Sequence, residues 1–300
     1  MNFWRRRGEY WAACLALGAA RRLPESWTRR LIVGLAGVYH RLSARRRRTT
    51  LENLAIAFPE KSPEERAGIA QRCYRHFANM AADCLMLTSG RWTREDFLSR
   101  VDSEEGVARY RGYVSEWTHG VAQLSAHLGN WEFLFHFGAL MGYPSVGVVR
   151  KNANPLIEER ILRPARHQWG SRVVYKKEAV RALAREVANG GTVSMLIDQK
   201  TSHRFGAKIE FFGRETLAVR TPAALQARFG CRAIPTAMFR LDDGTYKLHI
   251  GEPIDWEDDG RPKEVQIDAL TQRHQSAVEA MIRMRPEQWF WMHNRWRLER

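Results

Sequence analysis

Cysteine is scarce in this chain, and long apolar runs are missing. The four cysteines, Cys14, Cys73, Cys84 and Cys231, stand far apart among 300 residues, with no Cys-x-x-Cys pair. This spacing argues against a disulfide framework and a cysteine-based zinc site, and it is typical of a reducing compartment. The early apolar stretch Trp11–Ala20 has about half of the roughly 20 residues that a transmembrane helix needs. We therefore predict neither a membrane-spanning helix nor a metal site.

Lysine is also scarce, and acidic residues are rare at the start of the chain. Only 8 of the 48 basic residues are lysine, so arginine supplies the other 40. Arginine suits bidentate phosphate binding, although a GC-rich genome would give the same bias. Residues 1–50 hold twelve arginines and two acidic residues, and so carry +10 of the net charge of +15. With 44% hydrophobic residues, the chain can bury a core, which excludes disorder.

The arginine-rich start is predicted to be helical and amphipathic. We expect two helices over residues 9–48, separated near Leu23-Pro24, the second at Trp27–Arg48. Apolar side chains between basic flanks, with tryptophans at the edges, are typical of helices that lie in a membrane interface. Residues 1–50 are therefore predicted to associate with an anionic membrane surface. An arginine-rich face packed on the protein is one alternative. A nucleic-acid partner is not predicted, because no helix-turn-helix or aromatic-basic RNA platform is present.

Residues 51–300 are predicted to form one domain of the α/β class, with a mixed central sheet flanked by helices. Ser62 and Glu65 form a capping-box pattern around Pro63, which predicts a helix that ends near Thr88. Beyond residue 100 strands and helices alternate. The predicted strands are Gly120–Ala126, Ser145–Val149, Arg172–Tyr175, Thr192–Ile197, Cys231–Phe239 and Tyr246–Ile250. The predicted helices are Asn130–Met141, Pro155–Trp169, Lys177–Asn189, Ala218–Phe229 and Glu264–Met284.

One strand-to-helix junction carries residues suited to catalysis. His127 stands directly after the strand Val121–Ala126, Gly129 permits a tight turn, and Asn130 is a good helix N-cap. Glu132 then falls in the first helical turn, where the helix dipole favours a carboxylate. A carboxylate bound to one imidazole nitrogen raises the basicity of the other, which makes a general base. A structural histidine is the alternative.

The spacing of this His-x4-acid pair is weak evidence by itself. The chain holds a second such pair, His274 and Glu279, inside a predicted helix. A separation of five residues places two side chains on different faces of a helix. We expect this second pair to lie on the surface.

Six motifs in order resemble one protein family, the bacterial late-stage lipid A acyltransferases of the lauroyl- and myristoyltransferase type, within the lysophospholipid-acyltransferase-like superfamily. The resemblance extends from about Asn53 to Trp296. The motifs are NLAIAFPEKSPEER (53–66), HLGNWE (127–132), VVRKNANP (148–155), LIDQK (196–200), FFGRETLAVRTPAALQARFGCRAIP (211–235) and PEQWFWMHNRW (286–296). The resemblance implies a glycerolipid-acyltransferase-like fold. It also implies that the protein is held, peripherally or monotopically, at the cytoplasmic face of the bacterial inner membrane.

The resemblance also implies a reaction. A fatty acyl chain would pass from an acyl carrier protein or CoA thioester to a hydroxyl of a glycolipid acceptor, a lipid A precursor. His127 would be the general base and Glu132 would orient and polarise it, with no acyl-enzyme and no resident cofactor. One alternative is the same chemistry on a lysophospholipid or a phosphoinositide mannoside with acyl-CoA as donor. A non-catalytic protein that binds anionic lipid or nucleic acid through its arginine-rich start is a further alternative. The oligomeric state is not indicated.

Further polar residues stand at strand ends on the same edge of the predicted sheet. Arg150 follows the strand Ser145–Val149 and is a candidate for binding an oxyanion or phosphate, and Asn154 lies in the same motif. Asp198 and Gln199 follow the strand Thr192–Ile197 and are candidates for lining the site. An exposed strand-end charge at Arg150 and a turn-capping role for Asp198 are the alternatives.

Two arginines further along the chain are weaker substrate-binding candidates. Arg220 precedes Thr221-Pro222 at a helix start and could contact phosphate. Arg295 stands in the carboxyl-terminal motif, among tryptophans and beside His293. This motif could anchor the protein at an interface or hold the head group of the acceptor, and it could equally pack over the sheet.

Overall fold

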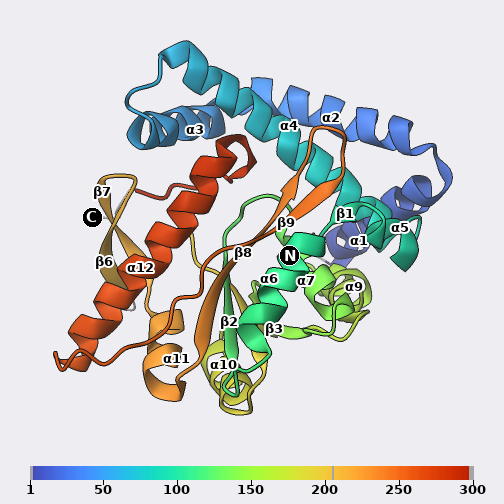
Figure 1. The fold of residues 1–300 in the computed structure, drawn as a ribbon. Coiled ribbons are helices and arrows are strands. Elements are labelled where there is room, and N and C mark those ends of the chain that lie inside the picture. Colours follow the sequence, from blue (N-terminus) through green and yellow to red (C-terminus); the bar gives the residue numbers. More distant parts are fainter. Residues whose placement is uncertain (1–2, 205, 297–300) are drawn as a thin grey trace.

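A seven-stranded sheet covered by helices on both faces forms the centre of the computed structural model, which describes residues 3–204 and 206–296 (Figure 1). The strands are β1 (Val101–Asp102), β2 (Val121–Ser125), β3 (Ser145–Val149), β4 (Arg172–Tyr175), β5 (Thr192–Leu196), β8 (Arg232–Arg240) and β9 (Tyr246–Ile250), and the hairpin β6 (Gly206–Phe211) with β7 (Arg214–Val219) stands apart. The helices after residue 60 are α4 (Pro63–Thr88), α5 (Arg94–Leu98), α6 (Glu104–Val114), α7 (Trp131–Leu140), α8 (Pro155–Ile157), η1 (Glu158–Leu162), α9 (Arg163–His167), α10 (Ala179–Ala188), α11 (Thr221–Phe229), α12 (Lys263–Met284) and η2 (Pro286–Gln288). The predicted α/β class is confirmed.

The sheet is mixed, as predicted. Its order is β1-β9-β8-β2-β5-β3-β4, and β8 with β9 is the antiparallel pair in an otherwise parallel arrangement. Strands β2 and β5 are neighbours although 66 residues separate their ends, Ser125 and Thr192. The carboxyl ends of β2, β5 and β3 therefore meet at one edge of the sheet, where open α/β sheets place their sites.

Two apolar cores cover the two faces of the sheet. Along β2, Ala122 and Leu124 belong to a core shared with α3, α10, α11, α12 and the β6–β7 hairpin. Val121 belongs to the other core, with α5, α6 and α7. This alternation follows from the strand geometry, which turns successive side chains to opposite faces. Both faces are buried, so β2 reads as a continuous buried strand.

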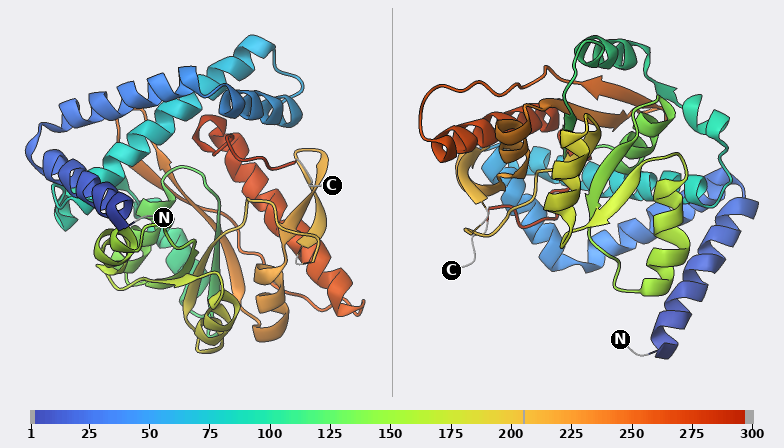
Figure 2. Two further views of the ribbon diagram at one scale, coloured as in Figure 1. Left: turned by 180° about the vertical axis from the view of Figure 1, so that it is seen from behind. Right: turned by 90° about the horizontal axis from the view of Figure 1, so that it is seen from below.

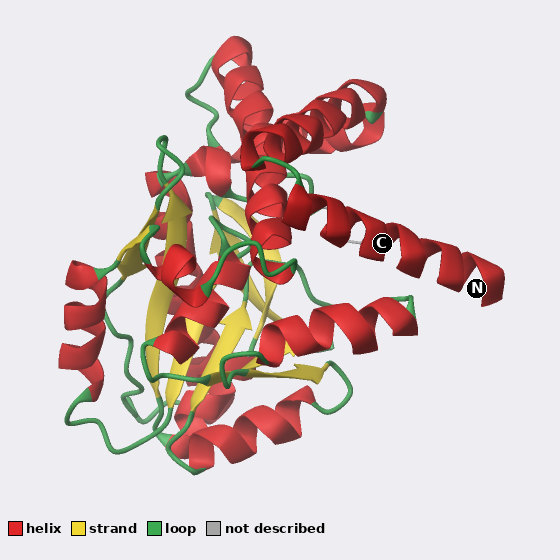
Figure 3. Ribbon diagram, turned by 90° about the vertical axis from the view of Figure 1, so that its right-hand side faces the viewer, coloured by secondary structure: helices red, strands yellow, loops and turns green. Residues whose placement is uncertain are grey.

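Helices α1 (Phe3–Arg22), α2 (Glu25–Leu42), α3 (Ala44–Ala57) and α4 form a layer along one side of the molecule (Figures 1 and 2). The predicted break at Leu23-Pro24 is observed. The predicted helix Trp27–Arg48 is instead divided at Ser43, and α3 continues across residue 50 to Ala57. Of the two predicted segments, 1–50 and 51–300, residues 1–2 and 297–300 lie outside the described residues. The helix that carries the amino terminus extends away from the strands (Figure 3).

The first two helices expose their apolar side chains. Within the described residues, eleven of the fourteen exposed large apolar side chains lie between residues 3 and 42, among them Trp4 (73% exposed), Trp11 (61%), Trp27 (65%) and Leu42 (79%). None of the helices in the described parts of the chain has the length and apolarity to cross a membrane. This segment therefore presents apolar and basic side chains together at the surface.

Four further features differ from the sequence prediction. The β6–β7 hairpin was not predicted, and its second strand takes up Ala218 and Val219, so α11 begins at Thr221. The short elements α5, β1 and α6 were also not predicted. The predicted helix Pro155–Trp169 contains one π-helical turn, η1. His274, expected at the surface, is buried because α12 packs on α11, where its Nε2 lies 2.7 Å from Gln226 Oε1.

Candidate active site

His127 lies at the start of a tight turn between β2 and α7. Gly129 in this turn has a φ of 60°, and a Cβ atom there would lie 2.1 Å from the carbonyl oxygen of Met238, so only glycine fits. The backbone N–H of Gly129 donates to the carbonyl of Gln288 at 3.0 Å, and that of Asn130 donates to the carbonyl of Met238 at 2.8 Å. The turn is thus bonded both to β8 and to η2, which fixes the place where His127 leaves the sheet.

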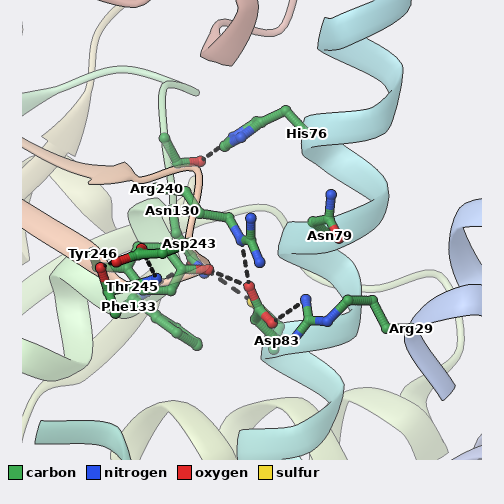
Figure 4. A network of polar contacts seen from close by, with 12 residues as sticks. Arg29, His76, Asn79, Asp83, Asn130, Phe133, Arg240, Asp243, Thr245 and Tyr246 are labelled. Atoms are coloured by element: carbon green, nitrogen blue, oxygen red, sulfur yellow. Dashed lines mark hydrogen bonds and ion pairs between the residues drawn. The ribbon is translucent and has the colours of Figure 1, made fainter. Parts of the chain in front are cut away.

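Asn130 caps α7, as predicted, and its amide joins the turn to a buried polar network (Figure 4). Its Oδ1 accepts a hydrogen bond from the backbone N–H of Phe133 at 3.1 Å, and its Nδ2 donates to the hydroxyl of Tyr246 at 3.2 Å. Tyr246 in turn donates to Asp83 of α4, which is fully buried. The start of α7 is therefore held through β9 to α4.

Asp83 is the carboxylate that pairs with two arginines of this network. Arg240 of β8 donates from Nε to Asp83 Oδ2 at 3.0 Å, and Arg29 of α2 approaches Asp83 Oδ1 with Nη1 at 2.6 Å (Figure 4). On the same helix as Asp83, His76 bonds the turn directly, with Nε2 3.1 Å from the carbonyl oxygen of Gly129. Burial lowers the pKa of His76 to about 4, so its ring is neutral near pH 7 and must carry its proton on Nε2 to donate to that carbonyl.

His127 and Asp198 come from neighbouring parallel strands and form a hydrogen bond. Ser125 pairs with Leu196, so the residues two positions further along each strand meet at the edge of the sheet. His127 Nδ1 lies 2.9 Å from Asp198 Oδ1, and Trp289 donates from Nε1 to Asp198 Oδ2 at 2.8 Å. Because the carboxylate binds Nδ1, the ring proton belongs on Nδ1 and Nε2 keeps its lone pair. This is the arrangement of a general base.

The electrostatics of the pair also suit a general base. Burial lowers the pKa of His127, but the charge of Asp198 and its hydrogen bond outweigh burial, and the net shift is upward. Burial raises the pKa of Asp198, but His127 and the N–H of Trp289 lower it more, to about 2. Asp198 is therefore ionised at every pH near neutrality, and its negative charge favours the protonated form of His127.

Glu132 does not bond to His127 as the sequence predicted. Its carboxylate makes a two-point ion pair with Arg166 of α9, with Arg166 Nη2 2.8 Å from Oε1 and Nε 3.2 Å from Oε2. Arginine offers two N–H groups in the fork that matches a carboxylate, and α9 brings them beside the first turn of α7. The hydrogen-bonded carboxylate of His127 is Asp198. Glu132 acts on His127 through space, where its negative charge contributes to the raised pKa.

A largely apolar cavity of about 360 Å³ lies against Trp131 and the ion pair of Glu132 with Arg166. Glu132 and Arg166 form its charged part, and Trp131, which also lines it, has its ring centroid 5.0 Å from that of His127. The volume lies in the range of small-molecule sites. The other lining residues come from α4, α7, η1 and α9: Phe77, Met80, Ala81, Cys84, Leu87, Thr88, Phe133, His136, Leu162 and Ala165.

The predicted substrate-binding residues near this edge have different surroundings. Gln199 lies beside His127, with its amide nitrogen 3.4 Å from both ring nitrogens. Arg150 is exposed after β3. Asn154 is buried, and its Nδ2 donates to the carbonyl of Arg6 at 2.8 Å and to Glu9 Oε2 at 3.1 Å. The amide of Asn154 thus holds α1 against α8 rather than facing an open site.

The two remaining predicted arginines are bound within the protein. Arg220 makes a two-point ion pair with Asp268 of α12, its Nη2 2.7 Å from Asp268 Oδ2. Arg295 is fully buried and donates from Nη1 to the carbonyl of Leu217 at 2.7 Å and from Nη2 to Gln275 Oε1 at 3.1 Å. Burial lowers the pKa of Arg295 to about 10. Both side chains join the β6–β7–α11 region to α12 or to the carboxyl-terminal segment.

The sequence did not predict the contacts or surroundings of three residues near the site. Arg166 is the partner of Glu132, and the amphipathic pattern of its helix gave no sign of this. Trp289 is buried and binds Asp198, so of the roles left open for its segment the structure shows packing within the protein. His293 is half-buried, and its pKa is lowered to about 4 by burial although the charge of Asp198 opposes this shift. The clustering of tryptophan and histidine near the carboxyl end was the available signal.

The thiols of Cys73, Cys84 and Cys231 are poor nucleophiles. Burial raises the pKa of Cys73 and of Cys231 to about 12, and that of Cys84 well above its ordinary value. A thiol acts as a nucleophile through its thiolate, which these three cysteines do not form near neutral pH. These three thiols are therefore poor candidates for holding a covalent intermediate near neutral pH.

Comparison with known proteins identifies the family of this chain. Residues 4–298 match the family described as bacterial lipid A biosynthesis acyltransferase. The lipid A biosynthesis lauroyltransferase of Escherichia coli (strain K12) is 26% identical, in an alignment that covers 96% of this chain and 92% of the relative. The corresponding E. coli myristoyltransferase is 24% identical and lipid A biosynthesis acyltransferase 1 of Shigella flexneri is 23% identical, each over 96% of this chain and 87% of the relative. This chain belongs to the bacterial lipid A biosynthesis acyltransferase family.

Proposed function

We propose that this enzyme transfers a fatty acyl chain from an acyl carrier protein or CoA thioester to a hydroxyl of a lipid A precursor, with His127 as general base. The observation that carries the proposal is the pairing of His127 Nδ1 with Asp198 Oδ1 at 2.9 Å beside the apolar cavity of about 360 Å³. The family match supports acyl transfer and the lipid A precursor as acceptor. The choice of carrier and the roles of the residues are part of the proposal.

The proposed reaction needs no covalent intermediate on the enzyme. His127 Nε2 takes the proton of the acceptor hydroxyl while the hydroxyl oxygen attacks the carbonyl carbon of the thioester. The C–S bond then breaks, and the leaving thiolate takes the proton from the imidazolium, which gives an ester and a free thiol. Asp198 keeps the ring oriented and stabilises its positive charge. The high pKa values of Cys73, Cys84 and Cys231 support direct attack rather than a cysteine-bound acyl group.

The apolar cavity is the proposed place for the acyl chain. Its lining is mostly aliphatic and aromatic, and its charged part is the ion pair of Glu132 with Arg166. In this proposal Glu132 fixes Arg166 beside the reacting carbonyl and adds to the negative potential at His127. Positioning two long substrates accounts for much of the rate enhancement expected of such a site.

The exposed helical start is proposed to hold the enzyme at the cytoplasmic face of the inner membrane, peripherally or monotopically. Trp4, Trp11 and Trp27 are exposed by 73%, 61% and 65% on helices that also carry many of the twelve arginines of residues 1–50. Apolar side chains that enter the acyl boundary, with arginine and tryptophan at head-group level, would bind an anionic bilayer. Both substrates of the proposed reaction carry acyl chains, so binding at the membrane would bring the site to them.

One assay tests the proposal. The purified protein is supplied with acyl carrier protein or CoA thioesters together with a lipid A precursor, a lysophospholipid or a phosphoinositide mannoside, and products are detected by mass spectrometry. We expect transfer to the lipid A precursor, reduced roughly 10²- to 10⁴-fold in His127→Ala. His119→Ala, at an exposed loop histidine, is the matched control and retains activity. No transfer to any acceptor by the wild type would refute the proposal, and transfer to another lipid alone would replace the acceptor.

A further inference from the structure

A second cavity, of about 460 Å³, lies between α3 and the segment that follows η2. Arg45, Arg46 and Arg48 line it from α3, and Asn294 lines it from the carboxyl-terminal side. Glu52 is the carboxylate of this lining. The three guanidinium groups therefore outnumber the acidic side chain, and the cavity carries a positive charge.

The arginines are placed where their charges are least favourable for the helix. Residues 45–48 are four consecutive arginines in the first turns of α3, which has no acidic residue in its first turn and no side-chain cap from Ser43. The amino-terminal end of a helix dipole is positive and favours anions. Within the described residues, no carboxylate pairs with Arg45 or Arg48, whereas Arg47 turns back to the carbonyl of His40 at 2.9 Å. Like charges gathered at the positive end of a helix are stabilised when an anion binds among them.

The cavity wall is anchored to the same segment as the candidate active site. Arg46 donates to the carbonyl of Met292 at 3.0 Å. The buried Asn53 of α3 donates from Nδ2 to the carbonyls of Trp291 at 2.7 Å and His293 at 2.6 Å. Two residues before Met292, the N–H of Phe290 donates to the carbonyl of His127 at 3.0 Å, and two residues of chain span at most about 7 Å. The cavity wall and the backbone of His127 are therefore joined by one short segment of chain.

We propose that this cavity binds a phosphate group carried by a substrate of the acyl transfer, and this inference rests on the function proposed above. Guanidinium groups bind phosphate oxygens through two parallel N–H···O bonds. The side chains of Thr49 and Asn294, on opposite walls, add neutral donors. A phosphate on the head group of the glycolipid acceptor is the first source to test, because the cavity adjoins the helical layer with the exposed apolar side chains. The phosphates of a CoA donor are the second source.

The experiment compares substrates with and without phosphate in micelles of a neutral detergent, which removes the anionic membrane surface. The acceptors are a lipid A precursor and its phosphatase-treated form, and the donors are acyl-CoA and acyl-pantetheine. We expect the wild type to prefer one phosphate-bearing substrate in kcat/KM. In the double variant Arg45→Gln/Arg48→Gln that preference falls roughly tenfold or more, through KM, because charge-assisted hydrogen bonds are lost.

The matched control removes two other arginines from the same helical layer. Arg30 and Arg41 are exposed on α2 and lie outside the cavity lining. The double variant Arg30→Gln/Arg41→Gln should keep the phosphate preference. An equal loss of preference in both double variants would assign the effect to general charge and overturn the site. The substrate whose phosphate preference collapses in Arg45→Gln/Arg48→Gln identifies the source of the phosphate.

Failure of this site and failure of the proposed function give different results. If the wild type transfers acyl chains and Arg45→Gln/Arg48→Gln keeps its phosphate preference, the site is refuted and the function stands. If the wild type transfers nothing, the site is tested by calorimetry with inorganic pyrophosphate. Binding that is lost in Arg45→Gln/Arg48→Gln but kept in Arg30→Gln/Arg41→Gln supports the site without the reaction, and binding that is equal in all three proteins refutes it. Unchanged thermal unfolding of each variant excludes misfolding.

Discussion

Arg29 of α2 and the fully buried Asp83 of α4 are joined by an ion pair of 2.6 Å between Nη1 and Oδ1. Asp83 also accepts hydrogen bonds from Arg240 and Tyr246, and Tyr246 accepts one from Asn130, the cap of α7. A continuous set of polar contacts therefore connects a helix of the amino-terminal layer to the turn that carries His127. The network holds the helical layer and the candidate active site in one arrangement.

Replacing Asp83 should destabilise the protein markedly. In Asp83→Asn the guanidinium groups of Arg29 and Arg240 lose their shared carboxylate while they remain largely buried, with side-chain exposures of 22% and 14%. Breaking such a buried pair costs about 3 kcal/mol or more of the free energy of unfolding. Chemical denaturation measures the change. Glu215→Gln breaks the exposed pair of Lys208 with Glu215 and should cost under about 1 kcal/mol; an equal effect of the two substitutions would contradict this account of the network.

The sequence predicted the positions of His127 and Asp198 at strand ends but not the contact between them. Both residues were predicted to follow strands, and both do. Their contact depends on β2 and β5 being neighbours, which nothing local in the sequence determines because β3, β4 and their helices lie between them along the chain. The nearer acid, Glu132, was the natural choice by spacing. A long-range partner, Arg166, holds it instead.

The same distinction applies to the rest of the fold. Local signals predicted the capping box at Ser62 and the cap at Asn130, because a cap needs only the residues of one turn. The β6–β7 hairpin was missed although its turn residues, Phe212 and Gly213, both adopt positive φ values of 52° and 71°, as type I′ hairpin turns require. A phenylalanine at such a position gives no hairpin signal. The burial of Arg295 depends on contacts with β7 and α12 that its own segment does not reveal.

The pH dependence of activity should report the charge of Asp198. A general base must be unprotonated, so kcat/KM should fall as the pH drops through the pKa of His127, which lies above its ordinary value of 6.5. In Asp198→Asn the attraction that raises this pKa is lost and burial lowers it, so the acid limb should move to lower pH while the plateau rate falls. The profile is measured between pH 5 and 9, a window of about four units around neutrality. An acid limb that stays in place in Asp198→Asn would exclude Asp198 as the charge that acts on His127.

The contribution of Asp198 to the free energy of unfolding should depend on pH in the acid range. The pKa of Asp198 is about 2 in the folded protein, below its ordinary value of 3.8, so its ionised form stabilises the fold above that ordinary value. This contribution should be lost as the pH falls from 3.8 towards 2. Asp198→Asn lacks it at every pH. The difference in the free energy of unfolding between wild type and variant should therefore shrink in this acid range, and a constant difference would contradict the shifted pKa.

Glu132 and Arg166 should act as a unit. Glu132→Gln leaves the guanidinium of Arg166 without its carboxylate at the polar part of the apolar cavity, and Arg166→Gln leaves the carboxylate without its cation. If the ion pair positions one group for the reaction, either single substitution removes most of the effect and the double substitution adds little. A double-mutant cycle on kcat/KM measures the coupling, expected at about 1 kcal/mol or more for contacting residues. Additive losses would show that Glu132 acts on the reaction independently of Arg166, for example directly on a substrate.

The turn at Gly129 offers a test of how far the position of His127 depends on backbone geometry. In Gly129→Ala the new Cβ atom would lie 2.1 Å from the carbonyl oxygen of Met238, on a backbone with a φ of 60°. The turn cannot accept this atom without moving away from β8, so the hydrogen bond from Asn130 to Met238 and the placement of His127 are both lost.

Gly90→Ala is the matched control, because Gly90 has a φ of 72° but no atom within 4 Å of an added Cβ. That control should cost only about 1–2 kcal/mol, the price of the left-handed conformation, and should keep its kcat. Gly129→Ala should cost more stability and should lose activity even where thermal unfolding shows that it remains folded. Equal effects of the two substitutions on kcat would mean that the close approach of the turn to β8 does not set the position of His127.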